Sequence, residues 1–283
     1  MNRFFKIFSV AIGVTALTFL IALAQPASAQ DLVILHTNDT HSQIEPENAG
    51  LAKGLGGYER RENFINSVRK ENKHVLLMDA GDFSQGTPYF TLYKGDVEIE
   101  LMNALKYDVA CIGNHEYDNG QEELARRIKN ANFPVLCANY DFSQSPLNEV
   151  VKPYVILRKA GKKIGVIGIS VKLNGLVSPS NLTNMSYIQP YKVINNLAAL
   201  LRNDEHCDLV IVLSHCGISN GSEQNPSDDM IAQHTEGVDF IIGGHSHTYI
   251  EQQRIYKNKA GKDVVVVQDG ERGEHIGRLN IWF

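Results

Sequence analysis

The chain has 283 residues, of which 43% are hydrophobic and 21% are charged, and its formal net charge is −5 at pH 7. This composition is typical of a globular protein with a hydrophobic core. A mildly acidic chain lacks the basic surface that proteins use to bind DNA or RNA. We therefore exclude nucleic acid as an expected partner.

The first residues have the features of a secretory signal peptide. Arg3 and Lys6 form a short basic start, an apolar run extends over residues 7–24, and Ala27-Ser28-Ala29 offers a small-x-small cleavage site. We expect residues 1–29 to be removed and the mature protein to be exported, to the periplasm or the extracellular space, without a membrane attachment. A retained membrane anchor is the alternative, because the apolar run is close to the length that spans a bilayer.

Short β-rich runs alternate with helix-like stretches in the first half of the chain. We predict strands over residues 32–36, 75–78, 109–112 and 135–137, with helices over 58–70, 97–105 and 121–130 between them. Alternation of this kind is typical of a layered α/β fold built from βαβ units.

The second half of the chain begins with a different pattern. Residues 159–162 (Lys-Ala-Gly-Lys) predict a hairpin turn between strands over 154–157 and 163–169. A helix over 193–203, strands over 209–213 and 240–242, and a last strand ending at 281–283 follow. No internal repeat or change in composition marks a second mature domain, so we expect one domain over residues 30–283.

The four cysteines show no C-x-x-C spacing, and most of them lie in or beside apolar, strand-like runs. They are Cys111, Cys137, Cys207 and Cys216. Buried free thiols are the simpler interpretation. A disulfide between Cys111 and Cys137 stays open if their strands are neighbours.

Five of the predicted strands end in residues of the types that bind metal ions. In chain order these residues are Asp39 and His41, then Asp82, then Asn114 and His115, then His215, and finally His245 and His247. The carboxyl ends of the strands in an α/β sheet meet at one crevice. Side chains from five loops can therefore converge there and bind two divalent cations.

Each cluster also has a simpler explanation when it is taken alone. Gly81-Asp82 is a common turn, and His215 could be a hydrogen-bonded core histidine. Asp118 could cap the helix that begins near Gln121, because the D-x-x-Q spacing has the form of a capping box. Five such strand ends in one chain nevertheless indicate a metal site. The remaining histidines are expected to be structural or exposed; they are His36, His74, His206, His234 and His275.

These clusters resemble the five-block signature of the calcineurin-like metallophosphoesterases. The matching blocks, in order, are Asp39-x-His41, Gly81-Asp82, Gly113-Asn114-His115-Glu116, His215 and Gly244-His245-x-His247. Within that superfamily, the blocks at 38–41, 81–86 and 113–118 look like those of the 5′-nucleotidase and UDP-sugar hydrolase family. The resemblance covers nearly the whole mature chain. It implies a four-layer α/β/β/α sandwich of the metallo-dependent phosphatase type, with two β-sheets between helices.

The resemblance also implies a role for each residue of the site. One metal ion would be bound by Asp39, His41, Asp82 and His247, and the other by Asp82, Asn114, His215 and His245. Asp82 would bridge the two ions. Mixed nitrogen and oxygen ligands suit Zn²⁺, Mn²⁺ or Fe, and the sequence does not choose among them. His115 resembles the catalytic histidine that binds no metal, with Asp118 as its orienting partner, and Asn114 and His115 would also contact the substrate.

We therefore predict a hydrolase that cleaves phosphate esters with a metal-bridging hydroxide. The leading hypothesis is a 5′-nucleotidase-like phosphomonoesterase acting on nucleotides. A 2′,3′-cyclic nucleotide phosphodiesterase, a UDP-sugar diphosphatase or a sulfur-ester hydrolase would use the same metals. A catalytically silent, metal-binding partner subunit is the alternative that is not an enzyme.

The relatives implied by the resemblance usually carry a C-terminal domain that supplies stacking aromatic residues and arginines for the nucleotide. The last predicted strand of the catalytic domain ends at Phe283. We expect this chain to lack that domain, and a separate substrate-binding polypeptide to supply the missing half.

Overall fold

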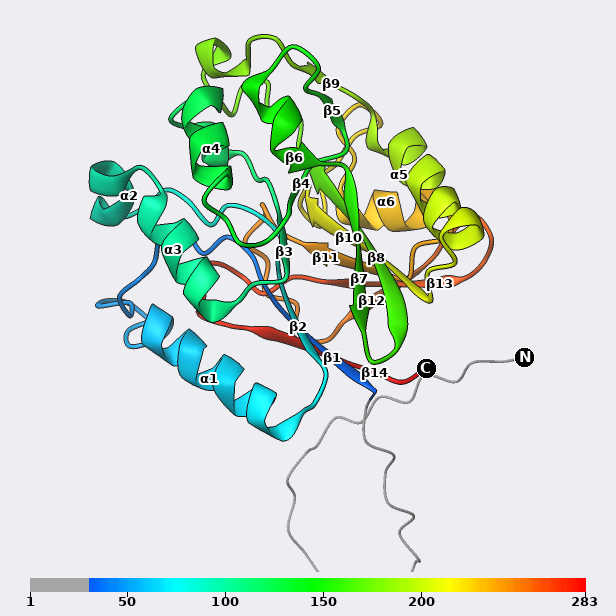
Figure 1. Cartoon of the computed structure of the whole chain (residues 1–283), viewed down its shortest axis with the longest axis horizontal. Coiled ribbons are helices and arrows are strands. Elements are labelled where there is room, and N and C mark those ends of the chain that lie inside the picture. Colours follow the sequence, from blue (N-terminus) through cyan, green and yellow to red (C-terminus); the bar gives the residue numbers. More distant parts are fainter. Residues whose placement is uncertain (1–30) are drawn as a thin grey trace, which may run out of the picture.

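The first of two large β-sheets contains both the first and the last strand of the fold (Figure 1). The computed structural model describes residues 31–283, so the signal peptide expected over 1–29 lies outside the described residues. The strand order is β14-β1-β2-β3-β4-β6, and only the β14–β1 pair is antiparallel. These strands are β1 (Leu32–Thr37), β2 (Val75–Asp79), β3 (Val109–Cys111), β4 (Val135–Leu136), β6 (Val151–Lys152) and β14 (Gly277–Ile281).

The second large sheet has the order β12-β13-β11-β10-β8-β7. Its four inner strands run parallel, and each edge strand is antiparallel to its neighbour. The predicted hairpin is confirmed, with Lys159 opposite Lys162. These strands are β7 (Tyr154–Lys159), β8 (Lys162–Ser170), β10 (Leu209–His215), β11 (Phe240–Gly243), β12 (Arg254–Lys257) and β13 (Asp263–Val267), and a small third sheet pairs β5 (Tyr140–Asp141) with β9 (Ser186–Tyr187).

Helices cover the outer face of each large sheet (Figure 1). The first sheet is covered by α1 (Tyr58–Glu71), α3 (Asp96–Leu105) and α4 (Gln121–Ile128), with α2 (Pro88–Tyr93) further out, and the second sheet by α5 (Pro190–Ala199) and α6 (Asp228–His234). A π-helical turn over Leu200–Asp204 continues α5, and three 3-10 helices are η1 (His115–Tyr117), η2 (Pro146–Glu149) and η3 (Pro179–Leu182). None of the helices within residues 31–283 is long and apolar enough to cross a membrane.

Alternating side chains of the strands explain why the layers stack in this order. In β1, Val33 and Leu35 pack with the helices, whereas Leu32 and Ile34 face the second sheet. Side chains alternate between the two faces of a strand, so one strand can contribute to two cores. A fully buried side chain of this kind contributes about 1.5–3 kcal/mol. The predicted four-layer α/β/β/α sandwich is confirmed.

The described cysteines are free and buried, as the simpler interpretation predicted. Strands β3 and β4 are neighbours, but Cys111 lies opposite Leu136 in the pairing. Cys137 is one residue further along and therefore points to the other face: Cys111 packs between the two sheets and Cys137 packs under the helices. This register keeps the two thiols apart.

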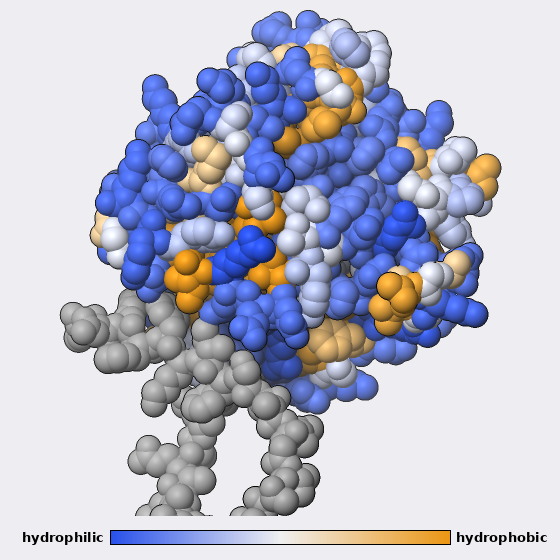
Figure 2. Space-filling view, turned by 180° about the vertical axis from the view of Figure 1, so that it is seen from behind, coloured by the Kyte–Doolittle hydropathy of each residue, from blue (hydrophilic) through white to orange (hydrophobic). Residues whose placement is uncertain are grey.

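The molecular surface on the face opposite to the view of Figure 1 is mainly hydrophilic. Figure 2 shows hydrophobic residues there in several separate patches rather than in one continuous area. The strand side chains that define the fold are buried within the layers instead. The polar residues at the strand ends are therefore the most informative feature for function.

Candidate metal centre

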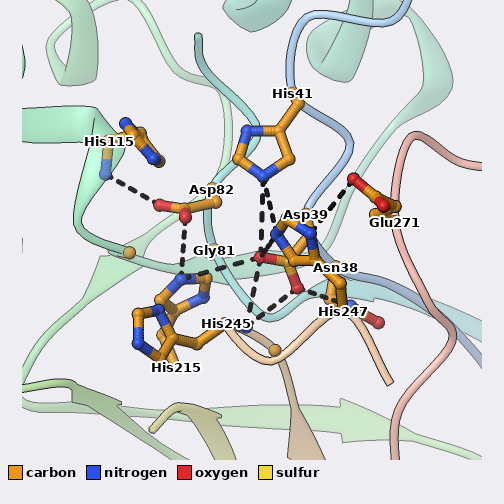
Figure 3. A network of polar contacts seen from close by, with 12 residues as sticks. Asn38, Asp39, His41, Gly81, Asp82, His115, His215, His245, His247 and Glu271 are labelled. Atoms are coloured by element: carbon orange, nitrogen blue, oxygen red, sulfur yellow. Dashed lines mark hydrogen bonds and ion pairs between the residues drawn. The ribbon is translucent and has the colours of Figure 1, made fainter. Parts of the chain in front are cut away.

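The candidate residues converge at the carboxyl ends of strands from both large sheets (Figure 3). Asp39, Asp82 and His115 follow β1, β2 and β3 of the first sheet, while His215 ends β10 of the second sheet and His245 follows β11. Within each sheet these strands run parallel, so their carboxyl ends share one edge. The predicted convergence of five loops is what the fold produces.

One group of possible ligand atoms is formed by Asp39, His41 and His247. These atoms all lie within 4.8 Å of one another. The two Nε2 atoms of the histidines are 3.0 Å apart, and Asp39 Oδ1 lies 3.4 Å from His247 Nε2. Two imidazole nitrogens directed at the same space as a carboxylate make a suitable donor set for a divalent cation.

A second group is formed by Asp82, His215 and His245, again with ligand atoms within 4.8 Å. Asp82 Oδ2 lies 3.0 Å from His215 Nε2. On the other side of its ring, His215 donates from Nδ1 to the carbonyl of Ala80 at 2.8 Å. This hydrogen bond fixes the ring and leaves Nε2 directed at the carboxylate, an arrangement that is usual for metal-binding histidines.

The predicted ligand Asn114 is the N-cap residue directly before η1, and it is 5% exposed. Its Oδ1 atom is buried and has no hydrogen-bond partner. A buried polar atom without a partner is costly, and a cation is one kind of partner that removes the cost. The amide oxygen therefore fits a ligand role beside the second group.

A third group links His115 to His41 and Asp82. The rings of His115 and His41 have their centroids 5.4 Å apart. His115 was predicted to bind no metal, yet one of its ring nitrogens lies within 4.8 Å of possible ligand atoms of His41 and Asp82. Its Nδ1 is already hydrogen-bonded to Asp118 Oδ2 at 2.8 Å, which leaves only Nε2 for a second partner.

The loops that carry these side chains have an unusual backbone conformation. Residues other than glycine rarely adopt a positive φ, and such residues cluster at functional sites. Five candidate ligands do so here: Asp39, His41, Asp82, His245 and His247, with φ between 47° and 76°. The loops also pack closely against one another. A Cβ on Gly244 would lie 2.8 Å from His215 Nδ1, so this position has no room for a side chain.

Backbone N–H groups hold the two carboxylates in place. Asp39 Oδ2 accepts from the N–H of His245 at 2.9 Å, and Asp82 Oδ1 accepts from the N–H of His115 at 2.8 Å. Each bond joins two different loops. The two carboxylates therefore connect the loops through hydrogen bonds within the protein itself.

Burial and charge set the protonation of the histidines. Burial lowers the pKa of His41 and lowers that of His245 to about 4, so both rings are neutral near pH 7. Burial also acts to lower the pKa of His215, but the carboxylates of Asp82 and Asp39 outweigh it and raise the pKa to about 10. A buried positive charge is thus favoured between these carboxylates, and a divalent cation supplies such a charge.

The pair of His115 and Asp118 lies at the partly exposed edge of the centre. The hydrogen bond that His115 Nδ1 donates to the Asp118 carboxylate raises the pKa of His115 and favours its imidazolium form. The capping role considered for Asp118 is wrong: the residue that caps α4 is Gly120, and no side chain caps that end. The Asp118 carboxylate faces His115 instead, because η1 brings residues three apart onto the same side.

Several residues that support the centre were not predicted. Glu116 accepts backbone N–H groups from Asp82 and Gly113, which joins two of the ligand loops. Glu271 Oε2 lies 3.0 Å from Nδ1 of His247, and Gln268 accepts from the N–H of Thr248 at 2.6 Å. Gln268 and Glu271 follow β13, so they form a sixth polar cluster after a strand. The pattern that indicated the other five clusters, polar residues directly after a strand, could also have indicated this one.

Comparison with known proteins agrees with this geometry. Residues 32–249 match the family described as Calcineurin-like phosphoesterase. The chain belongs to the calcineurin-like phosphoesterase family. Members of this family are enzymes that hydrolyse phosphate esters and use two divalent metal ions, which confirms the predicted class of enzyme and its cofactors.

The relatives of this phosphoesterase carry more specific names. It is 33% identical to the snake venom 5′-nucleotidase of Crotalus adamanteus over an alignment of 298 positions, which covers 95% of this chain and 48% of the relative. The crystal structure of a 5′-nucleotidase precursor from Thermus thermophilus superposes with a TM-score of 0.80 and 32% identity, covering 87% of this chain and 50% of the other.

A third similar protein is the NAD nucleotidase of Haemophilus influenzae, with a TM-score of 0.74 and 29% identity over 88% of this chain and 46% of the other. The chain spans about half the length of the curated relatives it matches. The predicted resemblance to the 5′-nucleotidase family is confirmed.

Proposed function

We propose that this phosphoesterase is 5′-nucleotidase-like and hydrolyses phosphate monoesters of nucleotides. The observation that carries the proposal is the meeting of two donor groups, Asp39 with His41 and His247, and Asp82 with His215 and His245. The two groups adjoin, because Asp39 Oδ1 also lies 3.7 Å from His215 Nε2. Such an arrangement suits two neighbouring cations.

We assign the ligands as the motif positions suggest. Asp39, His41, Asp82 and His247 hold one cation, and Asp82, Asn114, His215 and His245 hold the other. When bound, the two cations supply Lewis acidity toward the phosphoryl group and a nucleophile at neutral pH. Asp82 can serve both positions because it belongs both to the group with His215 and His245 and to the group with His41 and His115.

His115 and Asp118 act on the substrate rather than on the cations. The imidazolium form that Asp118 favours carries a positive charge and a free N–H donor at Nε2. That donor binds a phosphoryl oxygen and stabilises the charge that develops there and on the leaving alkoxide. Asn114 is the N-cap residue of the same turn and lines the phosphate site beside His115.

We also propose the wider organisation of the protein. Residues 30–283 form one catalytic domain, and residues 1–29 direct its export to the periplasm or the extracellular space.

A panel assay tests the proposed reaction. The purified chain is incubated with Mn²⁺ or Zn²⁺ and either AMP, UDP-glucose, NAD, a 2′,3′-cyclic nucleotide or an aryl phosphate. We expect release of inorganic phosphate from AMP and from the aryl phosphate. The similarity to an NAD nucleotidase favours a nucleotide diphosphatase as the second candidate, which would cleave the diphosphate bridge of NAD or UDP-glucose instead. Bound metal without any turnover would support the silent partner subunit.

A further inference from the structure

The turn that carries His115 and Asp118 is too short to hold its own shape. Its backbone bonds run from Tyr117 N to Asn114 O and from Asp118 N to His115 O, both 3.2 Å long. One isolated turn of 3-10 helix is not stable in water, and the carbonyl groups at its end need partners from elsewhere. The position of the His115–Asp118 pair therefore depends on contacts from outside the turn.

The Glu116 side chain binds two neighbouring loops, and Arg127 donates to the Glu116 carbonyl at 2.7 Å. The end of the turn is contacted by Asn181, which lies in η3 between β8 and β9 and is 63 residues further along the chain than Asp118. The side-chain amide of Asn181 donates to the carbonyl of Tyr117 and to the carbonyl of Asp118, both at 3.0 Å. One Asn side chain thus donates to two successive carbonyl groups at the end of η1, of which that of Tyr117 also accepts from the N–H of Gly120 at 2.9 Å.

Asn181 is itself held in place by Gln121, the first residue of α4, whose side chain is 3% exposed. The Gln121 amide donates to the carbonyl of Asn181 at 3.0 Å and to that of Thr183 at 2.7 Å. Its oxygen accepts a hydrogen bond from the hydroxyl of Ser145. The backbone around Asn181 is therefore fixed against the helix that follows the turn.

We propose that Asn181 is a positioning residue for phosphate ester hydrolysis. It holds the carbonyl end of η1, so that the Asp118 carboxylate stays at Nδ1 of His115 and the imidazole stays beside Asp82 and His41. Asn181 touches neither the cations nor the phosphate and acts only through the His115–Asp118 pair. This inference rests on the role of His115 in the proposed function.

The first test compares Asn181→Ala with the wild-type chain in AMP hydrolysis with Mn²⁺. Misplacement of a catalytic group by about 1 Å can lower the rate by about 10²-fold. We expect kcat to fall at least about 10-fold, while KM and the bound metal per chain stay unchanged. Thr183→Ala is the matched control, because it trims an exposed side chain of the same segment and keeps the backbone carbonyl that Gln121 binds. A wild-type kcat for Asn181→Ala would overturn the inference.

The second test separates positioning from general stability. In a His115→Ala background, Asn181→Ala should cause no further loss of kcat, because its effect passes through His115. An undiminished loss in that background would show a merely structural role and overturn the inference. Asn181→Asp keeps the size of the side chain but presents oxygen to two carbonyl groups, so it should slow kcat as much as Ala or more. It serves as a second variant if Asn181→Ala folds poorly.

The two proposals fail in distinguishable ways. Slow turnover by His115→Ala together with normal turnover by Asn181→Ala overturns only the positioning role. Normal turnover by His115→Ala overturns the proposed role of His115 itself, and the positioning role with it.

Discussion

Asp82 Oδ2 lies 3.0 Å from Nε2 of His215, and this contact joins the two large sheets. Asp82 follows β2 of the first sheet and His215 ends β10 of the second. Burial acts to raise the pKa of Asp82, but the charge of His215 outweighs it and holds the pKa below its usual range. The carboxylate is therefore ionised in the folded protein, as a bridging ligand has to be.

The Asp82 carboxylate gives the first prediction. Asp82→Asn removes the negative charge between the two donor groups, so bound Mn²⁺ or Zn²⁺ should fall well below two ions per chain. Metal analysis after gel filtration measures this directly. Asp204→Asn, at an exposed position on the π-helical turn, is the control and should keep its metal. A fully metallated Asp82→Asn protein would contradict the bridging role.

His115 gives the second prediction, because it lies within ligand distance of His41 and Asp82. Removing a donor that stabilises a transition state typically costs about 10²–10³-fold in kcat. We expect His115→Ala to lower kcat by this amount while the chain keeps about two metal ions, as the family uses. Steady-state kinetics and metal analysis of the same preparation check both parts. Loss of a metal ion would reassign His115 as a ligand.

Glu116 gives the third prediction. Its Oε2 accepts from the N–H groups of Asp82 at 2.9 Å and Gly113 at 2.7 Å, and its Oε1 accepts from Ser84 at 3.0 Å. In Glu116→Gln the new NH₂ group faces at least one of these donors, which leaves a buried N–H without an acceptor. The free energy of unfolding should fall by about 1–3 kcal/mol. Urea denaturation measures it, and Glu149→Gln, which is exposed, should show no such change. Equal stabilities of the two variants would refute this interpretation.

Asp228 gives the fourth prediction, which concerns pH. Burial raises the pKa of this fully buried carboxyl from 3.8 to about 8, although the hydroxyl of Ser214 donates to it at 2.5 Å. The unfolded chain loses this proton near pH 4, whereas the folded chain keeps it to about pH 8. The folded state therefore binds more protons between these values, and the free energy of unfolding falls as the pH rises.

Asp228→Asn removes that titration while keeping the size of the side chain. As the pH rises from 5 to 8, the free energy of unfolding of the variant should increase relative to that of the wild type. Urea denaturation of the metal-free proteins at both values gives the comparison, in which the contributions of groups that do not interact with Asp228 cancel. A difference in stability that did not change with pH would contradict the buried, protonated Asp228.

The large strands and the metal-ligand clusters could be predicted from the sequence because their signals are local. A run such as Leu32–Leu35 is apolar enough to be buried on both faces, and the polar residue types that follow it are conspicuous. The short helix α2 and the two-residue strands β5, β6 and β9 were not predicted, since they are too short to show a periodicity. The capping role of Asp118 was wrong. The D-x-x-Q spacing in the sequence does not show that the Asp118 carboxylate binds His115 instead of the first turn of α4.

Apart from Gln268 and Glu271, which follow a strand, the supporting residues could not be predicted, since their roles depend on contacts between distant parts of the chain. Asn38 donates to the carbonyl of Gly270, which is 232 residues away. Asn181 and Gln121 are ordinary polar residues in the sequence, and only the docking of η3 against η1 gives them a role. Glu116 belongs to a recognised motif, but the motif does not show which backbone groups its carboxylate binds.

The distribution of the candidate ligands along the chain has a consequence for biosynthesis. The backbone N–H of Arg272 donates to the carbonyl of Asp39, so the loop that carries the first ligand is completed by a segment close to the end of the fold. During translation the residues near position 39 leave the ribosome long before those near position 272. The proposed metal centre can therefore be completed only after the segment near Arg272 has been synthesised and has folded against the loop of Asp39.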